Sequence, residues 1–294
     1  MRVNIRVFRV GLASASEVMY AGRRMRRAIL LVAYGSSTAR GQGMLRSFDA
    51  RVRMKFPGLP VRWAYTSPLL RERLARGRQK SDSVPKALRR LCFEKFDTIA
   101  VQPLQTIPGR EHAAVLSAAD EIAGTEGVTL RVGEPLLASR GDIIRAAQAL
   151  LRHLPPERRP DEDVVFMGHG ARHDACSRYG ELATVLRGAD PRVHVGAMNG
   201  ADSLEDIIPR LSFGRVWLLP LLSTVGRHAL EDMAGEGQDS WRARIVAAGH
   251  ECVPVLKGTV EYPDIAEIWL DHLIRAADLG EGSKNVIRES ESYA

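Results

Sequence analysis

Several features are scarce in this chain, and each absence narrows the class of protein. The 294 residues include three cysteines, Cys92, Cys176 and Cys252, whose spacing matches no metal or redox motif and whose odd number provides no disulfide framework. No apolar run approaches the roughly 20 residues that span a bilayer. Neither a P-loop nor a Gly-x-Gly-x-x-Gly fingerprint follows a first strand. We therefore expect a cytoplasmic protein with no membrane association and no nucleotide cofactor.

Basic charge is abundant overall but scarce in the body of the chain. The formal net charge is +7, yet residues 1–27 hold seven arginines and one acid, Glu17, so the rest of the chain carries only +1. A nucleic-acid partner would need basic residues clustered on a folded surface, and none is expected. We interpret residues 1–26 as a disordered leader, with Met25 as an alternative start, and residues 279–294 as a disordered polar tail.

Apolar runs alternate with segments of helical period along the rest of the chain. Short apolar runs bounded by turn residues are typical of buried strands in parallel sheets. Eight strands are expected, four in each half of the chain: residues 28–35, 61–67, 98–104 and 129–135, then 164–170, 193–199, 215–221 and 251–258. This alternation predicts an α/β protein of two lobes, residues 27–140 and 141–278, each with a small parallel sheet flanked by helices.

The two halves also align residue by residue where strands end. "PLQTIPGRE" at 103–111 matches "PLLSTVGRH" at 220–228 in its proline, leucine, glycine and arginine, at an offset of 117 residues. Ala33-Tyr34-Gly35 matches Gly168-His169-Gly170 at an offset of 135. The difference arises from extra residues in the first half, where the basic stretch "RERLARGRQK" (71–80) has no counterpart. The repeat predicts two similar lobes whose strand ends face a common cleft.

This repeat singles out residues that could share a site. Tyr34 and His169 occupy equivalent positions, as do Glu111 and His228, and ligands of open α/β sheets bind beyond the carboxyl ends of strands. Imidazoles together with a carboxylate suit divalent ions such as cobalt, iron, nickel and zinc. The pattern therefore predicts a metal site formed by His169, His228 and Glu111. His112 and His173 are doubtful candidates, and the remaining histidines are interpreted as structural.

Several segments together carry a family resemblance. "LLVAYGSS", "YTSPLLRERL", "VQPLQTIPGREH", "VFMGHGARH", "VHVGAM" and "LLPLLSTVGRHALEDMAGEGQDSWRARIVAAGHECVPVLKG" resemble the early-insertion sirohydrochlorin cobaltochelatases of anaerobic cobalamin biosynthesis, which are class II chelatases. The resemblance covers about residues 27–276 and is most specific over 219–258. It implies a tetrapyrrole cleft between the lobes, with His169 and His228 facing the metal and Glu111 in the family's Pro-Gly-x-Glu motif.

The resemblance also implies a function and a set of substrate contacts. The expected activity is insertion of Co²⁺, the substrate ion, into sirohydrochlorin. His169, His228 and Glu111 would bind the ion and accept protons. The expected substrate-binding residues are Tyr34, Ser36, Arg110, Arg172, Arg227 and Asn199, and the arginines are suited to carboxylates.

The chain departs from the family pattern at three positions. Gln105 or Thr106 stands where the family usually has a histidine, His112 where it has a tyrosine, and Asn199 where it has a glutamate that can bind metal. An amide offers an oxygen but no charge, so metal preference is an open question, and haem binding and homo-oligomer formation also stay open. The alternatives are an iron or nickel chelatase on the same tetrapyrrole, a non-catalytic metal or haem carrier, and a bilobal binding protein of the periplasmic kind.

Overall fold

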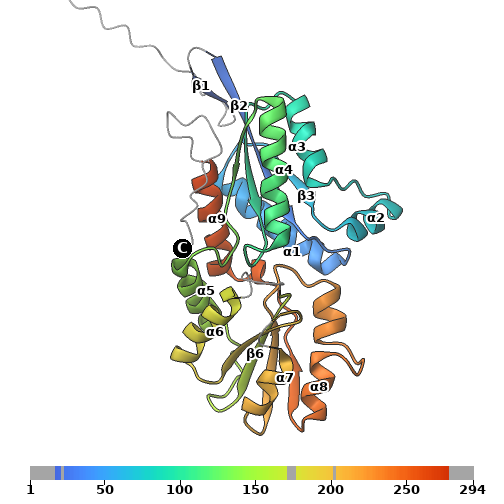
Figure 1. Ribbon diagram of the computed structural model, residues 1–294, viewed down its shortest axis with the longest axis vertical. Coiled ribbons are helices and arrows are strands. Elements are labelled where there is room, and N and C mark those ends of the chain that lie inside the picture. The colour runs from blue at the N-terminus through green and yellow to red at the C-terminus, as the bar shows by residue number, and fades with distance from the viewer. Residues whose placement is uncertain (1–16, 21–22, 171–176, 201–202, 278–294) are drawn as a thin grey trace, which may run out of the picture.

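The computed structural model describes residues 17–20, 23–170, 177–200 and 203–277. Two parallel sheets lie one above the other in Figure 1, each covered by helices on both faces. Within the described residues, no helix is both long and apolar enough to cross a bilayer.

The first sheet is built from residues of the first half of the chain. Its parallel strands run in the order β3-β2-β4-β5, and β1 pairs antiparallel with the beginning of β2. The bounds are β1 (Glu17–Tyr20), β2 (Arg23–Ala33), β3 (Val61–Tyr65), β4 (Thr98–Pro103) and β5 (Thr129–Val132). The helices of this half are α1 (Ala39–Lys55), α2 (Pro68–Arg76), α3 (Val84–Phe93) and α4 (Arg110–Glu126).

The second sheet has the same topology, in the order β7-β6-β8-β9. Its strands are β6 (Asp163–Gly168), β7 (Val193–Ala197), β8 (Arg215–Pro220) and β9 (Glu251–Pro254). The helical segments of this half of the chain are α5 (Arg140–Arg152), α6 (Ser177–Ala189), α7 (Leu204–Ile207), η2 (Ile208–Arg210), η3 (His228–Met233), α8 (Trp241–Ala247), η4 (Thr259–Glu261) and α9 (Pro263–Ala277). The predicted internal repeat and all eight predicted strands are therefore confirmed.

Equivalent glycines end the first strand of each sheet. Gly35 follows β2 with φ 95°, and Gly170 follows β6 and His169 with φ 81°. Residues with a Cβ rarely adopt such angles, so the chain leaves the extended conformation here at little cost only because glycine is present. The strands consequently end slightly earlier than the predicted 35 and 170, and Tyr34 and His169 lie in the turns that follow.

The core follows the alternation of side chains along the strands. Ile29 and Leu31 of β2 face α1 and α9, whereas Leu30 and Val32 face α3 and α4. Both faces of β2 are fully buried, which explains why its sequence is a continuous apolar run rather than an alternating one. One of the buried clusters extends from α1 and α9 through α5 and α6, so the two lobes share a continuous apolar core.

Two features of the chain differ from the predicted domain organisation. The predicted leader ended at residue 26, yet Glu17–Tyr20 pairs with Arg23–Arg26 through backbone hydrogen bonds, which require no apolar period. The backbone N–H of Arg26 also donates to Asp97 at 2.8 Å. At the other end, the predicted C-terminal lobe includes α9, but this helix packs back on β4 and β5 of the first sheet (Figure 1). Residues 1–16 and the predicted tail lie outside the described residues.

Polar contacts hold α9 against the segment that connects the two lobes. The His272 ring lies 2.8 Å from the carbonyl oxygen of Glu134 through Nδ1 and 3.1 Å from Asp142 through Nε2. Asp142 also accepts hydrogen bonds from the backbone and hydroxyl of Ser139, which forms the cap of α5. Both ring nitrogens of the buried imidazole therefore have an oxygen partner, one on each side of the lobe connection.

The two lobes meet closely where α1 begins. The hydroxyl groups of Ser36 and Thr38 donate to the carbonyl oxygen of Val225, at 3.4 and 3.3 Å. Gly41, in the first turn of α1, makes this approach feasible, because a Cβ built there would lie 2.2 Å from Ser36 Oγ and 2.8 Å from the Val225 carbonyl oxygen. The loop that leads to His228 is thus packed directly on the first lobe.

A glycine pair in α1 tests this lobe contact. Gly41→Ala is expected to lower the free energy of unfolding by about 1–3 kcal/mol, because the added methyl group meets backbone that cannot easily move. Gly43→Ala is the control: its Cβ has only the end of Arg46 nearby, at 3.7 Å, so the change should be neutral or raise stability by up to about 1 kcal/mol. Denaturant unfolding measures both, and equal effects would contradict the close lobe contact.

Candidate functional site

The second sheet brings two histidines to one edge. His169 directly follows β6, and His228 follows the loop after β8. β6 and β8 are hydrogen-bonded neighbours, with Met167 opposite Pro220 at their carboxyl ends. Because β7 lies on the other side of β6, this edge is the topological switch point of the sheet, where ligands of α/β proteins bind.

The two imidazole rings are in contact. Their centroids are 4.9 Å apart, and the ring planes are inclined at 76°. The ring of Tyr34, from the equivalent turn of the first lobe, lies 6.4 Å from that of His228 and is 41% exposed. Three of the residues predicted from the repeat, Tyr34, His169 and His228, therefore gather between the lobes.

His228 is oriented by a neighbour that the sequence analysis did not name. It begins the one-turn π-helix η3, and its Nδ1 lies 2.6 Å from a carboxylate oxygen of Asp232. Histidines that bind metals commonly donate their second N–H to a carboxylate, which fixes the tautomer and raises the basicity of the other nitrogen. Nε2 of His228 is thereby left for a ligand. The His-x-x-x-Asp spacing was the available signal, but it also matches an ordinary surface pair on a helix.

His169 is held mainly through its backbone. The side-chain amide of Asn199 donates to the His169 carbonyl oxygen at 3.2 Å. The approach is tight, since a Cβ on Gly170 would lie 1.8 Å from the Asn199 backbone oxygen. Asn199 is exposed and follows β7, which neighbours β6. Its observed contact fixes the turn that carries His169.

Glu111 lies in the first turn of α4, after the loop that leaves β4, and is half-buried. This is the position in the first sheet that corresponds to His228 in the second. Within the described residues there is no group of three or more His, Cys, Asp or Glu side chains that could hold a metal ion. The structure therefore pairs the two histidines, and a role for Glu111 as third ligand stays a prediction.

The other predicted substrate contacts have varied environments. Arg110 is exposed at the start of α4, and the Arg227 guanidinium donates to Glu231 at 2.7 Å. Ser36 is only 4% exposed, and its hydroxyl is engaged at the lobe contact with Thr38 and Val225. Arg172, like His173, lies outside the described residues.

Most of the other histidines have structural partners, as the sequence analysis expected. His153 lies 3.2 Å from a carboxylate oxygen of Asp264, and His194 lies 2.8 Å from a carboxylate oxygen of Asp163. His112, one residue after Glu111, is 5% exposed, and burial lowers its pKa to about 4. It is therefore a neutral imidazole packed beneath the start of α4 rather than a solvated group.

The two cysteines within the described residues, Cys92 and Cys252, are unsuited to chemistry at this site. Burial raises the pKa of the Cys252 thiol to about 12 and also raises that of Cys92. Thiolates are the reactive and metal-binding form of cysteine, so both residues are held in the inert form. Cys176 lies outside the described residues.

Comparison with known proteins identifies the family. The family model described as "Cobalt chelatase (CbiK)" matches residues 27–278. The chain belongs to the cobalt chelatase family. The sirohydrochlorin cobaltochelatase CbiKC of Nitratidesulfovibrio vulgaris is 52% identical over 255 residues, which are 85% of this chain and 90% of the relative. The sirohydrochlorin cobaltochelatase of Salmonella typhimurium is 30% identical over 263 residues, or 87% of this chain and 98% of the relative.

Solved structures of other chelatases share the fold of this cobalt chelatase family member. SirB from Bacillus subtilis with Fe³⁺ superposes with a TM-score of 0.61 at 14% identity, covering 86% of this chain and 96% of SirB. CbiX, the terminal enzyme for siroheme biosynthesis in denitrifying bacteria, gives 0.57 at 18% identity and covers 86% and 100% of the two chains. The predicted two-lobed α/β fold is therefore confirmed.

The contact between His228 and Asp232 leads to a test on this chelatase. Asp232→Asn should weaken Co²⁺ binding by about 10–100-fold, because the amide no longer fixes the tautomer or raises the basicity of the imidazole. Calorimetric titration with Co²⁺ measures the affinity. Glu231→Gln is the control: it removes the adjacent charge, which pairs with Arg227 instead, and should leave affinity nearly unchanged. Equal affinities of both variants and the parent chain would show that Asp232 does not support a ligand.

Proposed function

We propose that this chain is a sirohydrochlorin cobaltochelatase, which inserts Co²⁺ into sirohydrochlorin in cobalamin biosynthesis. Both curated relatives carry this name, and the family model is that of cobalt chelatases. The observation that carries the proposal is the contact of the His169 and His228 rings, 4.9 Å apart at the switch point of the second sheet. Cobalt and the tetrapyrrole are both substrates of this reaction.

Insertion makes three demands on the protein. The macrocycle must be held with its nitrogens accessible, two N–H protons must be removed, and a partly dehydrated ion must be delivered to that face. We assign ion delivery and proton acceptance to His169 and His228, because neutral imidazole both binds borderline divalent ions and accepts protons near neutral pH. Within the pair, Asp232 occupies Nδ1 of His228, so Nε2 is the atom assigned to either duty.

The remaining predicted residues complete the proposed site. Glu111 is proposed as a third ligand or proton acceptor from the first lobe. Sirohydrochlorin bears carboxylate arms, and Arg110, Arg172 and Arg227 are proposed to anchor them through charge-assisted hydrogen bonds. Tyr34 offers an exposed ring beside His228, against which the macrocycle can lie. Ser36 and Asn199 are proposed to contribute by positioning the two turns that bear Tyr34 and His169.

The identity of the inserted ion is a separate part of the proposal. A soft-to-borderline donor set of two imidazoles also suits iron and nickel, so an iron or nickel chelatase is the second candidate. Asn199 stands where the family pattern has a glutamate, and its amide offers an oxygen but no charge, so the ion preference is to be decided by experiment. A non-catalytic metal or haem carrier is the third candidate. We place the reaction in the cytoplasm.

The proposal is tested by mixing the purified protein with sirohydrochlorin and, separately, with Co²⁺, Fe²⁺ and Ni²⁺ under anaerobic conditions. The absorption spectrum of the macrocycle reports insertion directly. Faster insertion with Co²⁺ than with the other ions is expected. Insertion no faster than in buffer for every ion would favour the carrier, and a clear preference for iron or nickel would replace cobalt as the substrate.

Replacing the histidines tests their assigned roles. His169→Ala or His228→Ala should lower the rate of Co²⁺ insertion at least about 100-fold, since losing a ligand exceeds the 10–100-fold effect typical of losing its supporting partner. The free energy of unfolding should change little, because both side chains are only half-buried.

His250→Ala is the matched control for these variants. His250 precedes β9 at the amino end of the second sheet, away from the edge that bears His169 and His228. Its replacement should leave the insertion rate unchanged. Survival of full activity in both histidine variants would contradict the assigned site.

A further inference from the structure

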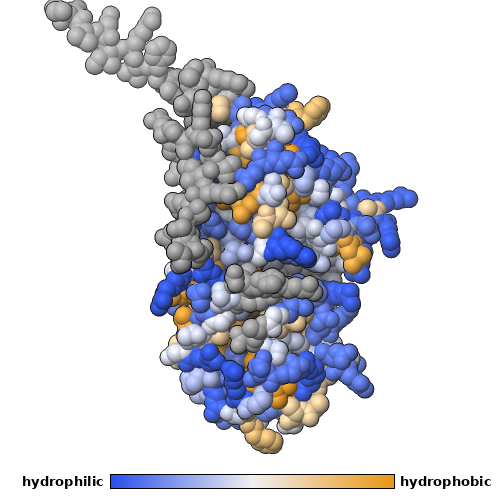
Figure 2. Space-filling view, in the orientation of Figure 1, coloured by the Kyte–Doolittle hydropathy of each residue, from blue (hydrophilic) through white to orange (hydrophobic). Residues whose placement is uncertain are grey.

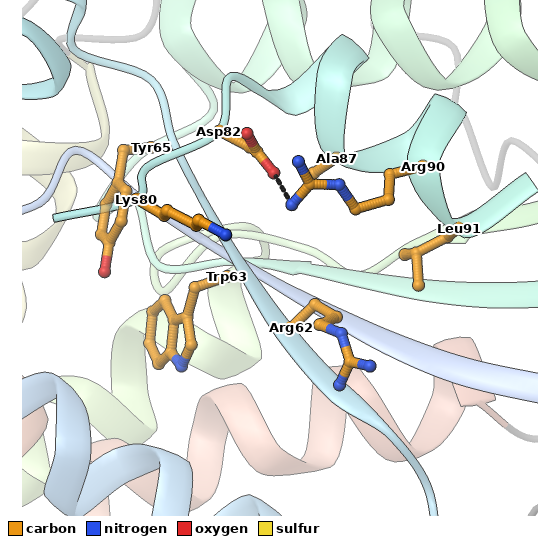
Figure 3. Close-up of a pocket in the computed structure, with 8 residues that line it drawn as sticks. All are labelled: Arg62, Trp63, Tyr65, Lys80, Asp82, Ala87, Arg90 and Leu91. Atoms are coloured by element: carbon orange, nitrogen blue, oxygen red, sulfur yellow. Dashed lines mark ion pairs between the residues drawn. The ribbon is translucent and has the colours of Figure 1, made fainter. Parts of the chain in front are cut away.

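A pocket of about 200 Å³ lies on the flank of the first lobe, away from the histidine pair. Its walls come from the edge strand β3, the loop between α2 and α3, and α3 itself (Figure 3). None of its lining residues belongs to the proposed metal site. It approaches that site only through Tyr65, whose ring abuts Gly35, the residue after Tyr34.

The pocket is apolar on some walls and basic on others. Trp63 supplies aromatic surface, and its ring stacks on that of Tyr65 with centroids 6.3 Å apart, whereas Leu91 is 1% exposed and lies beneath the pocket. Arg62 and Lys80 contribute cationic side chains from the strand and the loop (Figure 3). Such a combination suits a ring compound that also carries negative charge.

The acid in the pocket does not neutralise these cations. Asp82 is paired with Arg90 at 2.6 Å and with Lys86 at 3.1 Å, so its charge is already compensated. The ion pair of Arg62 with the partly exposed Glu94 is distant, at 3.7 Å, and the Arg62 guanidinium also donates to the carbonyl oxygen of Val61 at 3.4 Å. Among the described residues no ion pair of Lys80 is found. Arg62 and Lys80 are therefore the cations with most capacity to bind an added anion.

The basic character extends beyond the pocket. An open groove of about 610 Å³ along α2 shares Lys80, Asp82 and Arg90 with it. Together the two hollows are lined by six cations and two acids, namely Arg62, Arg71, Arg78, Lys80, Lys86 and Arg90 against Glu72 and Asp82. The flank where α2 lies is mostly hydrophilic in Figure 2. Because the chain after residue 27 carries only +1, this concentration is local.

The fold itself does not require this basic surface. The second lobe repeats the strand order of the first, yet nothing in it matches the basic stretch 71–80 that leads from α2 into the pocket. A feature present in one of two equivalent lobes is not explained by the packing that the lobes share.

We propose that this pocket is a second ligand site, for a planar ring bearing carboxylate groups. The ring packs against Trp63, and the carboxylates are bound by Arg62 and Lys80. Its volume holds a single substituted ring, or one acid-bearing edge of a larger macrocycle, but not a whole tetrapyrrole. Binding at this site does not depend on metal insertion, so it is tested independently of the proposed function.

Trp63 provides a direct readout of binding. The chain has four tryptophans, and Trp217, Trp241 and Trp269 are at most 7% exposed, whereas Trp63 lines the pocket. Titration with benzene-1,2-dicarboxylate should change tryptophan fluorescence saturably, and Trp63→Phe should remove the change. Cyclohexane-1,2-dicarboxylate, with the same charges but no aromatic ring, should bind more weakly.

Charge variants test the assigned cations. Arg62→Gln combined with Lys80→Gln should weaken binding at least about tenfold, because each lost charge-assisted hydrogen bond contributes substantially. The control removes two charges from exposed positions outside the pocket, Arg76→Gln combined with Arg187→Gln. Thermal unfolding checks both double variants. If the Arg62/Lys80 double variant unfolds at a lower temperature than the parent chain, the single variant Lys80→Gln, at an exposed position, replaces it in the binding measurement.

A second probe, the octacarboxylate uroporphyrin, distinguishes the source of the ring, with binding followed by calorimetry. Saturable binding of the dicarboxylate alone identifies a free aromatic acid as the ligand. Uroporphyrin binding that weakens in the Arg62/Lys80 variant, but not in the control, identifies the edge of a tetrapyrrole. If neither probe shows binding that depends on Arg62 and Lys80, the pocket is not a ligand site, whatever the metal-insertion assay shows.

Discussion

The contact between the imidazoles of His169 and His228 depends on the hydrogen-bonded pairing of β6 with β8. The parallel register places Met167 beside Pro220, so the backbone leaves both strands at the same edge of the sheet. Since β7 extends the sheet in the opposite direction, the connections diverge there and leave room for a ligand. The glycine after His169 then turns the backbone, with φ 81°, directly after the residue that bears the imidazole. The two imidazoles are thus brought together without a motif that is local in sequence.

The first lobe completes this arrangement by packing on the loop that carries His228. Ser36 and Thr38 donate to Val225, three residues before His228, and Gly41 permits the approach. Tyr34 leaves the same turn as Ser36 and reaches the His228 ring. The lobe contact that stabilises the fold therefore also sets the surroundings of the His228 ring. Asp232 contacts Nδ1 of the same ring at 2.6 Å.

Much of this organisation could be predicted from the sequence, because it depends on local patterns. The strands are apolar runs buried on both faces, and the equivalent positions of Tyr34 and His169 follow from alignment of the two halves. The return of α9 to the first sheet could not be predicted, since it depends on contacts such as Phe48 with Trp269, far apart in sequence. β1 was missed because its pairing is made by backbone atoms. Asp232 was missed because its spacing also fits a surface ion pair, and the basic stretch 71–80 was noted without the pocket that folding creates beside β3.

The central claim is that one Co²⁺ ion binds between His169 and His228. An anomalous difference map from a crystal soaked in Co²⁺, recorded at the cobalt absorption edge, tests it most directly. The account predicts a single strong peak within coordination distance of an imidazole nitrogen of both residues, with Nε2 as the ligand atom of His228. A strong peak bound elsewhere, with neither imidazole among its ligands, would contradict it.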